Sequence, residues 1–115
     1  MTSESEVAQF LKDFKRKMEF WDVLFRDDRG KNAQALLDLE LRPFERKTIL
    51  ETLENKDYCE GPLKEQLYGG SDMWVFGKMV KKNEIYIKIT MGIMDSSVIC
   101  ISFHLAEQKM QYPLK

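Results

Sequence analysis

Three segments in the second half of the chain are rich in branched and aromatic apolar residues, which is typical of β-strands. They span residues 73–80, 84–90 and 98–104. Short spacers separate them, Lys82-Asn83 after the first segment and residues 91–97 after the second. Because strands joined by short spacers pair with one another, the pattern predicts an antiparallel meander.

Alternation gives the second and third of these strands one apolar face and one polar face. The residues predicted for the apolar face are Ile85, Ile87, Ile89, Ile99, Ile101 and Phe103. Those predicted for the polar face are Tyr86, Lys88, Thr90, Cys100, Ser102 and His104, the only histidine of the chain. A phenol, an ammonium group, a hydroxyl and an imidazole would then share one rigid surface. We interpret this surface as a candidate for binding or reaction.

In the first half of the chain, apolar residues recur every three or four positions, as they do along one face of a helix. The elements expected here are helices over residues 4–18, 32–39 and 43–54 and a strand over residues 20–26. Ser3 and Glu6 match a capping box at the start of the first helix, and Pro43 suits the first turn of the last one. The apolar residues that these helices are expected to bury are Val7, Phe10, Leu11, Phe14, Met18, Ala33, Leu36, Leu37, Leu39, Phe44, Ile49, Leu50 and Leu53.

Two segments show no clear periodicity. Residues 55–72 contain the breakers Gly61-Pro62 and Gly69-Gly70, and we expect an irregular loop of a length that is often functional. The tail, residues 105–115, contains Tyr112-Pro113 and is expected to lie extended against the body of the protein.

The predicted order of elements is α-β-α-α-β-β-β. This order predicts a single α+β domain over residues 1–115, in which helices pack on an antiparallel sheet of four or more strands. A chain of 115 residues is long enough to bury a core without disulfides or metal ions. Its content of 43% hydrophobic and 32% charged residues is usual for a globular domain, so composition agrees with this prediction.

Composition indicates a cytoplasmic protein. The chain has no run of 18 apolar residues, so no membrane-spanning helix is expected. The acidic start, residues 1–6, is the reverse of a secretory signal peptide. Cys59 and Cys100 have no second cysteine or histidine at metal-ligand spacing. We therefore expect free thiols, no metal site and no cofactor.

The net charge of −1 is unevenly distributed along the chain. Residues 1–73 carry 12 Lys and Arg against 16 Asp and Glu, whereas residues 74–115 carry 6 against 3. Nucleic-acid-binding proteins usually present a basic face. Only the predicted sheet half offers one, and the overall balance argues against tight non-specific binding to nucleic acid.

The sequence contains no phosphate-binding glycine loop, paired-carboxylate signature, nucleophile elbow or metal motif. The candidate reactive residues are Tyr86, Lys88, Ser102 and His104, together with Lys78, Tyr58, Glu60 and Lys64. This set suits cleavage of RNA by its own 2′-hydroxyl. That reaction needs a base, an acid and cations that steady the charge on phosphorus, but no metal ion. A histidine can transfer the protons, and a tyrosine can donate a hydrogen bond or stack on a base.

A structural interpretation of the same residues stays open. A single histidine at a strand end is most often a structural or surface residue. Tyrosine and lysine alternating with isoleucine are usual on the polar face of a half-exposed strand. Trp74 and Phe76 fit packing better than base stacking.

The carboxyl-terminal strands resemble the signature of the MqsR toxins. Residues 84–89 (EIYIKI) and 98–104 (VICISFH) are similar to that family's V-Y-L-K-I strand and to its strand ending in V-S-F. Leu39-Glu40-Leu41 and the helical residues 49–53 resemble the family's L-G-L spacer and the helix after it. Two further pairs, at positions where the family has an aspartate–aromatic and an aliphatic–tryptophan pair, are Asp57-Tyr58 and Met73-Trp74.

The resemblance implies the RelE-like α+β fold of bacterial type II toxins and metal-free endoribonucleolytic cleavage of messenger RNA. It also implies a cognate antitoxin as partner, a DNA-binding helix-turn-helix protein that represses the shared operon. The family's functional tyrosine corresponds to Tyr86, and its basic residue after the S-F pair corresponds to His104. Its loop lysine falls near Glu60 and its glutamine after the tryptophan falls on Val75, so two of four positions depart from the family.

The sequence thus predicts a bacterial toxin that acts as a metal-independent endoribonuclease. The catalytic candidates are His104 as general acid or base, Tyr86 as orienting or stacking group, and Lys78 and Lys88 as phosphate-contacting cations. The RNA-binding candidates are Tyr58, Trp74, Lys81 and Lys82. An alternative is a non-catalytic protein-interaction module of the same fold, which the acidic N-terminal half and the departures at Glu60 and Val75 favour. A small-molecule hydrolase has no supporting motif.

Overall fold

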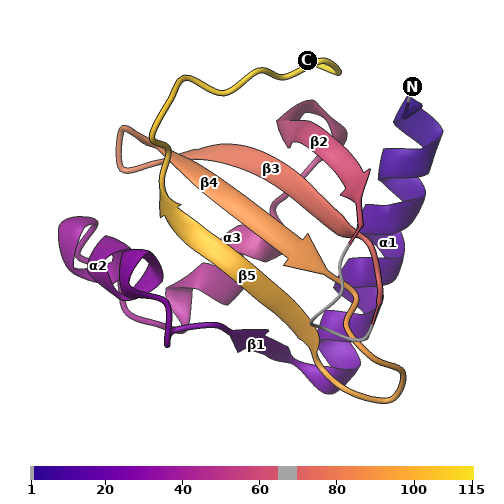
Figure 1. The fold of residues 1–115 in the computed structure, drawn as a ribbon, viewed down its shortest axis with the longest axis horizontal. Coiled ribbons are helices and arrows are strands. Elements are labelled where there is room, and N and C mark those ends of the chain that lie inside the picture. The colour runs from indigo at the N-terminus through magenta and orange to yellow at the C-terminus, as the bar shows by residue number, and fades with distance from the viewer. Residues whose placement is uncertain (1, 65–69) are drawn as a thin grey trace.

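The structure, a computed structural model, describes residues 2–64 and 70–115. The described residues form three α-helices, one 3₁₀-helix and one five-stranded sheet (Figure 1). The helices are α1 (Glu4–Trp21), α2 (Gly30–Asp38), α3 (Glu45–Glu51) and the 3₁₀-helix η1 (Asn55–Asp57). The strands are β1 (Val23–Phe25), β2 (Tyr58–Leu63), β3 (Met73–Val80), β4 (Asn83–Thr90) and β5 (Val98–Leu105). The predicted α+β class is confirmed.

The strands lie in the order β1-β5-β4-β3-β2. The predicted meander is confirmed, since β3, β4 and β5 pair as antiparallel neighbours. The prediction of a purely antiparallel sheet is wrong, because β1 runs parallel to β5. The prediction also missed β2, which pairs with β3 and occupies part of the segment expected to be irregular. The remainder of that segment includes residues 65–69, which lie outside the described residues.

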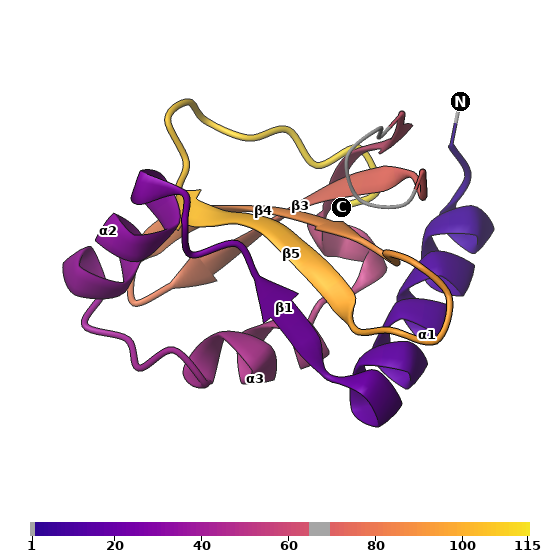
Figure 2. The same ribbon diagram turned by 60° about the horizontal axis from the view of Figure 1, so that its bottom comes forward.

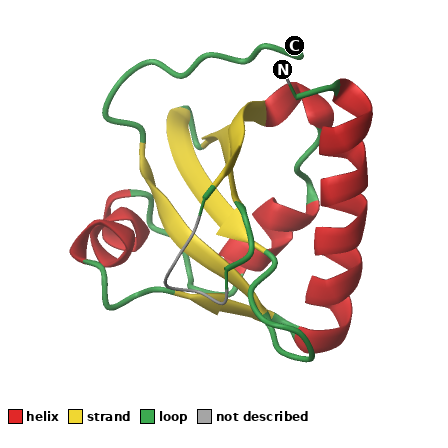
Figure 3. Ribbon diagram, turned by 45° about the vertical axis from the view of Figure 1, so that its right-hand side comes forward, coloured by secondary structure: helices red, strands yellow, loops and turns green. Residues whose placement is uncertain are grey.

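The helices α1 and α3 cover one face of the sheet, and the C-terminal tail crosses the other face (Figure 2). Figure 3 shows α1 running alongside the covered face. The core lies between the helices and the sheet, and it includes the apolar stripe of α1 and the isoleucines of β4. The helix α2 lies beside the β5 edge rather than over a face of the sheet (Figures 1 and 2). One face of the sheet is therefore left available for a site.

The helix α1 begins as predicted but ends later. Both hydrogen bonds of the capping box are present, between the Ser3 hydroxyl and the Glu6 amide and between the Glu6 carboxylate and the Ser3 amide. The helix continues to Trp21, so Phe20 and Trp21 do not join a strand as expected. Their side chains are exposed, Phe20 to 78%. The helical hydrogen bonds that continue from the cap outweigh the strand preference of these two aromatic residues.

The helices α2 and α3 also differ from the prediction. The helix α2 starts at Gly30, and its buried residues are Asn32 and Ala35, whereas Leu37 is exposed. The helix α3 starts only at Glu45, so Pro43 precedes it and Phe44 is exposed rather than buried. Both helices are short, with nine and seven residues, so each buries only a few side chains.

The β3–β4 hairpin turns at Lys81 and Lys82, one residue earlier than predicted. Both residues have positive φ angles, 49° and 71°, as the two central residues of a type I′ turn do. This turn matches the right-handed twist of the flanking strands. The turn therefore forms with two lysines at positions where glycine or asparagine is more usual.

A β-bulge in β5 changes which side chains face the core. Lys88 pairs with Ser102, but the next residue of β4, Ile89, pairs with Cys100, so Ile101 is the extra residue. Beyond the bulge, Cys100 turns into the core and Ile99 lies outside the core cluster. The prediction that Cys100 shares the polar face with Ser102 is therefore wrong.

The side chain of Asn32, buried in the first turn of α2, bridges to the backbone around this bulge. Its Nδ2 donates to the carbonyl oxygens of Arg26 and Ile101, both at 2.9 Å. Its Oδ1 accepts from the amide of Phe103, also at 2.9 Å. The strand β1 ends at Phe25, so no further peptide of β1 is available to pair with β5. The side-chain amide of Asn32 makes these hydrogen bonds to β5 instead.

Replacing Asn32 by leucine is expected to destabilise the fold. The change leaves the Phe103 amide and the Ile101 carbonyl buried without partners, at a cost of about 3 kcal/mol in the free energy of unfolding. Urea-induced unfolding measures this cost. The matched control is Gln34→Leu on the exposed side of α2, which should change the free energy by less than about 0.5 kcal/mol. Equal effects of the two substitutions would contradict this role for Asn32.

Candidate active site

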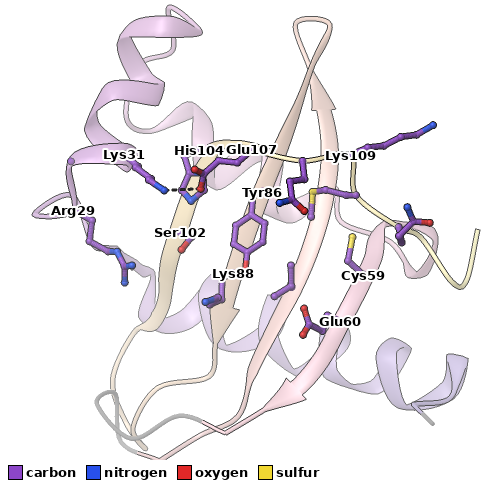
Figure 4. A pocket seen from close by; sticks show the side chains of 15 residues that line it. Arg29, Lys31, Cys59, Glu60, Tyr86, Lys88, Ser102, His104, Glu107 and Lys109 are labelled. Carbon is purple, nitrogen blue, oxygen red and sulfur yellow. Dashed lines mark hydrogen bonds and ion pairs between the residues drawn. The ribbon is translucent and has the colours of Figure 1, made fainter.

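A cleft of about 810 Å³ lies on the face of the sheet that the helices leave open (Figure 4). Its floor is formed by strands β2 to β5, and its walls by the start of α2 and the C-terminal tail. The charged and reactive side chains that line it are Arg29, Lys31, Cys59, Glu60, Tyr86, Lys88, Ser102, His104, Glu107 and Lys109. Five predicted candidates thus meet in one cleft: Glu60, Tyr86, Lys88, Ser102 and His104.

Strand register brings Tyr86 and His104 together. The two residues are directly paired across β4 and β5, and their rings stack with centroids 5.2 Å apart and planes 11° from parallel. Lys88 pairs with Ser102 in the neighbouring row. The Lys88 ammonium group also lies 5.8 Å from the centroid of the Tyr86 ring, within reach of a cation–π interaction.

A backbone contact indicates which ring nitrogen of His104 carries the proton. Nδ1 lies 3.0 Å from the carbonyl oxygen of Leu105. A carbonyl oxygen can only accept, so in this contact Nδ1 carries the proton. In the neutral ring Nε2 then has a free lone pair and can take a proton from a bound group.

Burial raises the pKa of the Tyr86 phenol, and the negative charge of Glu60 raises it further. Arg29 acts in the opposite direction but does not outweigh them. The phenol therefore stays protonated at neutral pH and can donate a hydrogen bond. It is not suited to be the base of a reaction.

Cys59 also lines the cleft, but its thiol is not activated. Burial, followed by the charges of Glu84, Asp57 and Glu60, raises the pKa of Cys59 to about 12. A thiol must lose its proton to act as a nucleophile. The chemistry of the cleft therefore lies with the other groups.

Cations outnumber carboxylates around the cleft. Lys31 is neutralised by Glu107, with Nζ and Oε1 2.6 Å apart. Arg29 and Lys88 have no ion-pair or hydrogen-bond partner among the side chains that the structure describes. Glu60 lies on β2, at the other end of the row from Ser102, with Val75 and Lys88 between them. The part of the cleft near β4 and β5 is thus suited to an anion.

The C-terminal tail forms a wall that the sequence did not predict as part of a site. Tyr112 donates from its hydroxyl to Glu84 at 2.7 Å, and the Met110 amide donates to the same carboxylate at 3.1 Å. Both side chains pack over Gly77 of β3, where an added Cβ would lie 2.4 Å from the Tyr112 hydroxyl. The expected extended tail is confirmed. A glycine inside a strand is the sequence signal for such a close approach.

Several predicted site residues lie away from the cleft. Lys78 pairs with Ile85, so its side chain is on the opposite face of the sheet from Tyr86. Its ammonium group binds the Asp57 carboxylate at 3.1 Å and the Thr52 carbonyl at 3.0 Å. Lys81 donates to the Glu40 carbonyl. Lys82 is exposed in the hairpin turn. The structure does not bring these lysines together with His104.

The two aromatic residues predicted to bind RNA lie in the core. Trp74 stacks on Phe10 of α1 with ring centroids 4.5 Å apart and is 9% exposed. Tyr58 is also buried, and its hydroxyl donates to the Gly61 carbonyl. Their rings are engaged in packing, as the structural interpretation of Trp74 expected. They offer no face to a base.

Sequence reasoning missed Arg29, Lys31, Glu107 and Lys109. Arg29 lies between the strand expected over residues 20–26 and the helix expected over residues 32–39, and Glu107 and Lys109 lie in a tail without periodicity. Their placement depends on how α2 and the tail meet the sheet. A local pattern does not contain that information.

Neither cysteine is expected to react quickly with an alkylating reagent. At about pH 8 a thiol whose pKa is raised is almost entirely protonated, and burial raises the pKa of Cys100 as well as that of Cys59. Mass spectrometry after iodoacetamide treatment should find both thiols unmodified in the native protein and both alkylated in denaturing urea. Fast alkylation of Cys59 in the native protein would refute the conclusion that its thiol is unreactive.

Replacing Gly77 by alanine is expected to release the tail. The added methyl group would overlap the Tyr112 hydroxyl and the Met110 sulfur, and the tail can move away more easily than the sheet. Limited carboxypeptidase digestion should therefore remove the C-terminal residues several times faster than in the unaltered protein. Gly30→Ala is the matched control, because a Cβ at Gly30 has no atom within 4 Å. Unchanged digestion of the Gly77 variant would contradict the packing described.

No three His, Cys, Asp or Glu side chains of residues 2–64 and 70–115 are grouped closely enough to hold a metal ion. No helix in this part of the chain has the length and hydropathy needed to cross a membrane. Comparison of the chain with protein-family models, with curated proteins and with solved structures finds no match.

Proposed function

We propose that this protein is a metal-independent endoribonuclease that cleaves messenger RNA, acting as the toxin of a bacterial type II toxin–antitoxin pair of the MqsR and RelE-like kind. The observation that carries the proposal is the stacked pair of Tyr86 and His104, in a cleft where Arg29 and Lys88 have no carboxylate partner among the described residues. Attack by a 2′-hydroxyl needs a group that transfers protons and groups that stabilise negative charge. An imidazole can do the first, and a phenol and an ammonium group can do the second.

In the proposed reaction the 2′-oxygen attacks the adjacent phosphorus. The new O2′–P bond forms as the P–O5′ bond breaks, which leaves a 2′,3′-cyclic phosphate and a 5′-hydroxyl. His104 carries one of the two protons that move, either by taking the proton of the 2′-hydroxyl on Nε2 or by giving a proton to the leaving 5′-oxygen. Water exchanges the other proton.

The neighbours of His104 would stabilise charge rather than move protons. The phenol of Tyr86 stays protonated because burial and Glu60 raise its pKa, so it can donate to a phosphate oxygen. The Lys88 ammonium group lies in the adjacent row and can steady the extra negative charge on phosphorus. Lys78 has no part in this proposal because Asp57 holds it.

The resemblance to the MqsR toxins supports the proposal at Tyr86 and His104. At the two departing positions, Glu60 and Val75 both line the cleft, so they occupy a site region while changing its chemistry. The catalytic set would then rest on β4 and β5 alone. The proposed partner is a cognate antitoxin with a DNA-binding helix-turn-helix domain.

Replacing His104 by alanine is expected to lower RNA cleavage by at least about 100-fold, because one proton transfer loses its carrier. Tyr86→Phe keeps the stacked ring but removes a hydrogen bond to a charged group, and should lower cleavage by about tenfold. The measurement is cleavage of a single-stranded RNA in the presence of a chelator. Lys12→Ala, on the exposed face of α1, is the control and should leave the rate unchanged.

Failure of the unaltered protein to cleave RNA, together with harmless expression in the absence of any partner, would refute the nuclease. Unfolding in urea checks that each variant keeps its fold. If His104→Ala is folded and cleaves at the unaltered rate, His104 is not the proton carrier.

A second candidate function is a protein-interaction module, which exposed apolar residues favour. Phe20 and Trp21 at the end of α1 contact each other and are exposed. The β4–β5 loop, with exposed Ile93 and Met94, is tied to the same end by a Lys17 ammonium group that donates to the Ile93 carbonyl at 2.6 Å. Stable binding of a helix-turn-helix protein encoded beside it, without any RNA cleavage, would favour this module over the nuclease.

A further inference from the structure

The first turn of α2 presents its positive end to the cleft. The helix has nine residues, and no side chain caps its N-terminus. Asn32 and Ala33 direct their amides to the Arg29 carbonyl, whereas the amides of Gly30 and Lys31 have no acceptor within the described part of the chain. Free amides and the helix dipole favour an anion at this position.

Ser102, on the cleft face of β5, supplies an independent indication of a ligand. It is 3% exposed, and its hydroxyl has no hydrogen-bond partner among the residues that the structure describes. The residue is buried but its hydroxyl oxygen is open to the cleft, since every buried side-chain nitrogen or oxygen atom of the described residues has a hydrogen-bond partner. The hydroxyl points into the cleft, where a bound group can pair with it (Figure 4).

Two cations flank this hydroxyl. Figure 4 shows the Arg29 side chain on one side of Ser102 and the Lys88 side chain on the other. Both line the cleft, and neither has a carboxylate partner among the described residues. The side chain of Arg29 is exposed and can adjust to a ligand, while Lys88 is held in the strand row of Ser102.

We propose that these groups form a phosphate subsite of the cleft, between the N-terminus of α2 and strands β4 and β5. A guanidinium group, an ammonium group, a hydroxyl and free amides together offer donors for several oxygens of one tetrahedral anion. The subsite binds a phosphodiester group of single-stranded RNA, and this identification rests on the proposed function. It adds Arg29, Ser102 and the start of α2 to the groups that position the substrate next to His104.

The test measures binding of a short single-stranded 2′-O-methyl oligoribonucleotide, which cannot be cleaved by its own 2′-oxygen. Fluorescence anisotropy should show dissociation constants raised about tenfold by Arg29→Gln and by Ser102→Ala. Arg29→Gln should also flatten the dependence of log Kd on log salt concentration by about 0.7, the value for one phosphate contact on a single strand. Arg42→Gln and Ser96→Ala, which lie outside the cleft, are the matched controls and should behave as the unaltered protein.

Replacement of single phosphates locates the contact. In oligonucleotides that carry one neutral methylphosphonate linkage, the unaltered protein should lose affinity at one linkage. Arg29→Gln should lose nothing further at that same linkage, because the contact is already absent. Additive losses at every linkage would overturn the subsite.

The outcomes separate this proposal from the nuclease. If both variants bind the oligonucleotide as the unaltered protein does while RNA is still cleaved, the subsite is refuted and the nuclease stands. If binding depends on both residues but RNA is never cleaved, the nuclease is refuted and the subsite stands. Dependence on both residues for inorganic phosphate, with no binding of the oligonucleotide, would overturn RNA as the source of the phosphate. Urea-induced unfolding of the Ser102→Ala variant shows whether it is folded, so that a loss of binding is not mistaken for a loss of fold.

Discussion

One buried amide group, the side chain of Asn32, holds together the parts on which the cleft depends. The strand β1 is only three residues long, so its pairing with β5 ends at Cys100 while β5 continues. The Asn32 amide then serves as the next peptide, donating to the Ile101 carbonyl and accepting from the Phe103 amide. A bulge leaves such backbone groups out of step with a regular ladder, and unpaired they would be costly to bury. The same side chain fixes the first turn of α2 against β5, which places the free amides of that helix beside the cleft.

The bulge also marks the limit of what the sequence could predict about the site. Alternation correctly assigned Tyr86 and Lys88 to the open face, because the isoleucines between them repeat without interruption. It failed at Cys100, because the bulge depends on Asn32, which is 69 residues distant from Ile101 in sequence. Likewise, Lys78 could be named as a basic residue of a strand, but its face depends on its pairing with Ile85 of β4, and no local pattern specifies that pairing.

The same distinction applies to the fold. The capping box and the apolar stripe predicted α1, and turn spacing predicted the meander, because both are local signals. The strands β1 and β2 are harder to predict from the sequence. The first is only three residues long, and the second contains Gly61-Pro62, a pair that normally indicates a loop. Their place in the sheet comes from their partners β5 and β3, not from their own composition.

The position of Glu60 in the cleft explains how a carboxylate fits a site proposed to bind phosphate. Glu60 lies on β2, whereas the cations Arg29 and Lys88 lie toward β4 and β5. The cleft is thus electrostatically divided, and a phosphate group would be attracted to the β5 side and repelled from the β2 side. The Glu60 carboxylate can accept hydrogen bonds, for instance from the amino group of a base. The negative charge of Glu60 also raises the pKa of Tyr86, which keeps the phenol a donor and leaves proton transfer to His104. A carboxylate at this position is therefore compatible with the proposed reaction, because it lies away from the proposed phosphate position and keeps the Tyr86 phenol protonated.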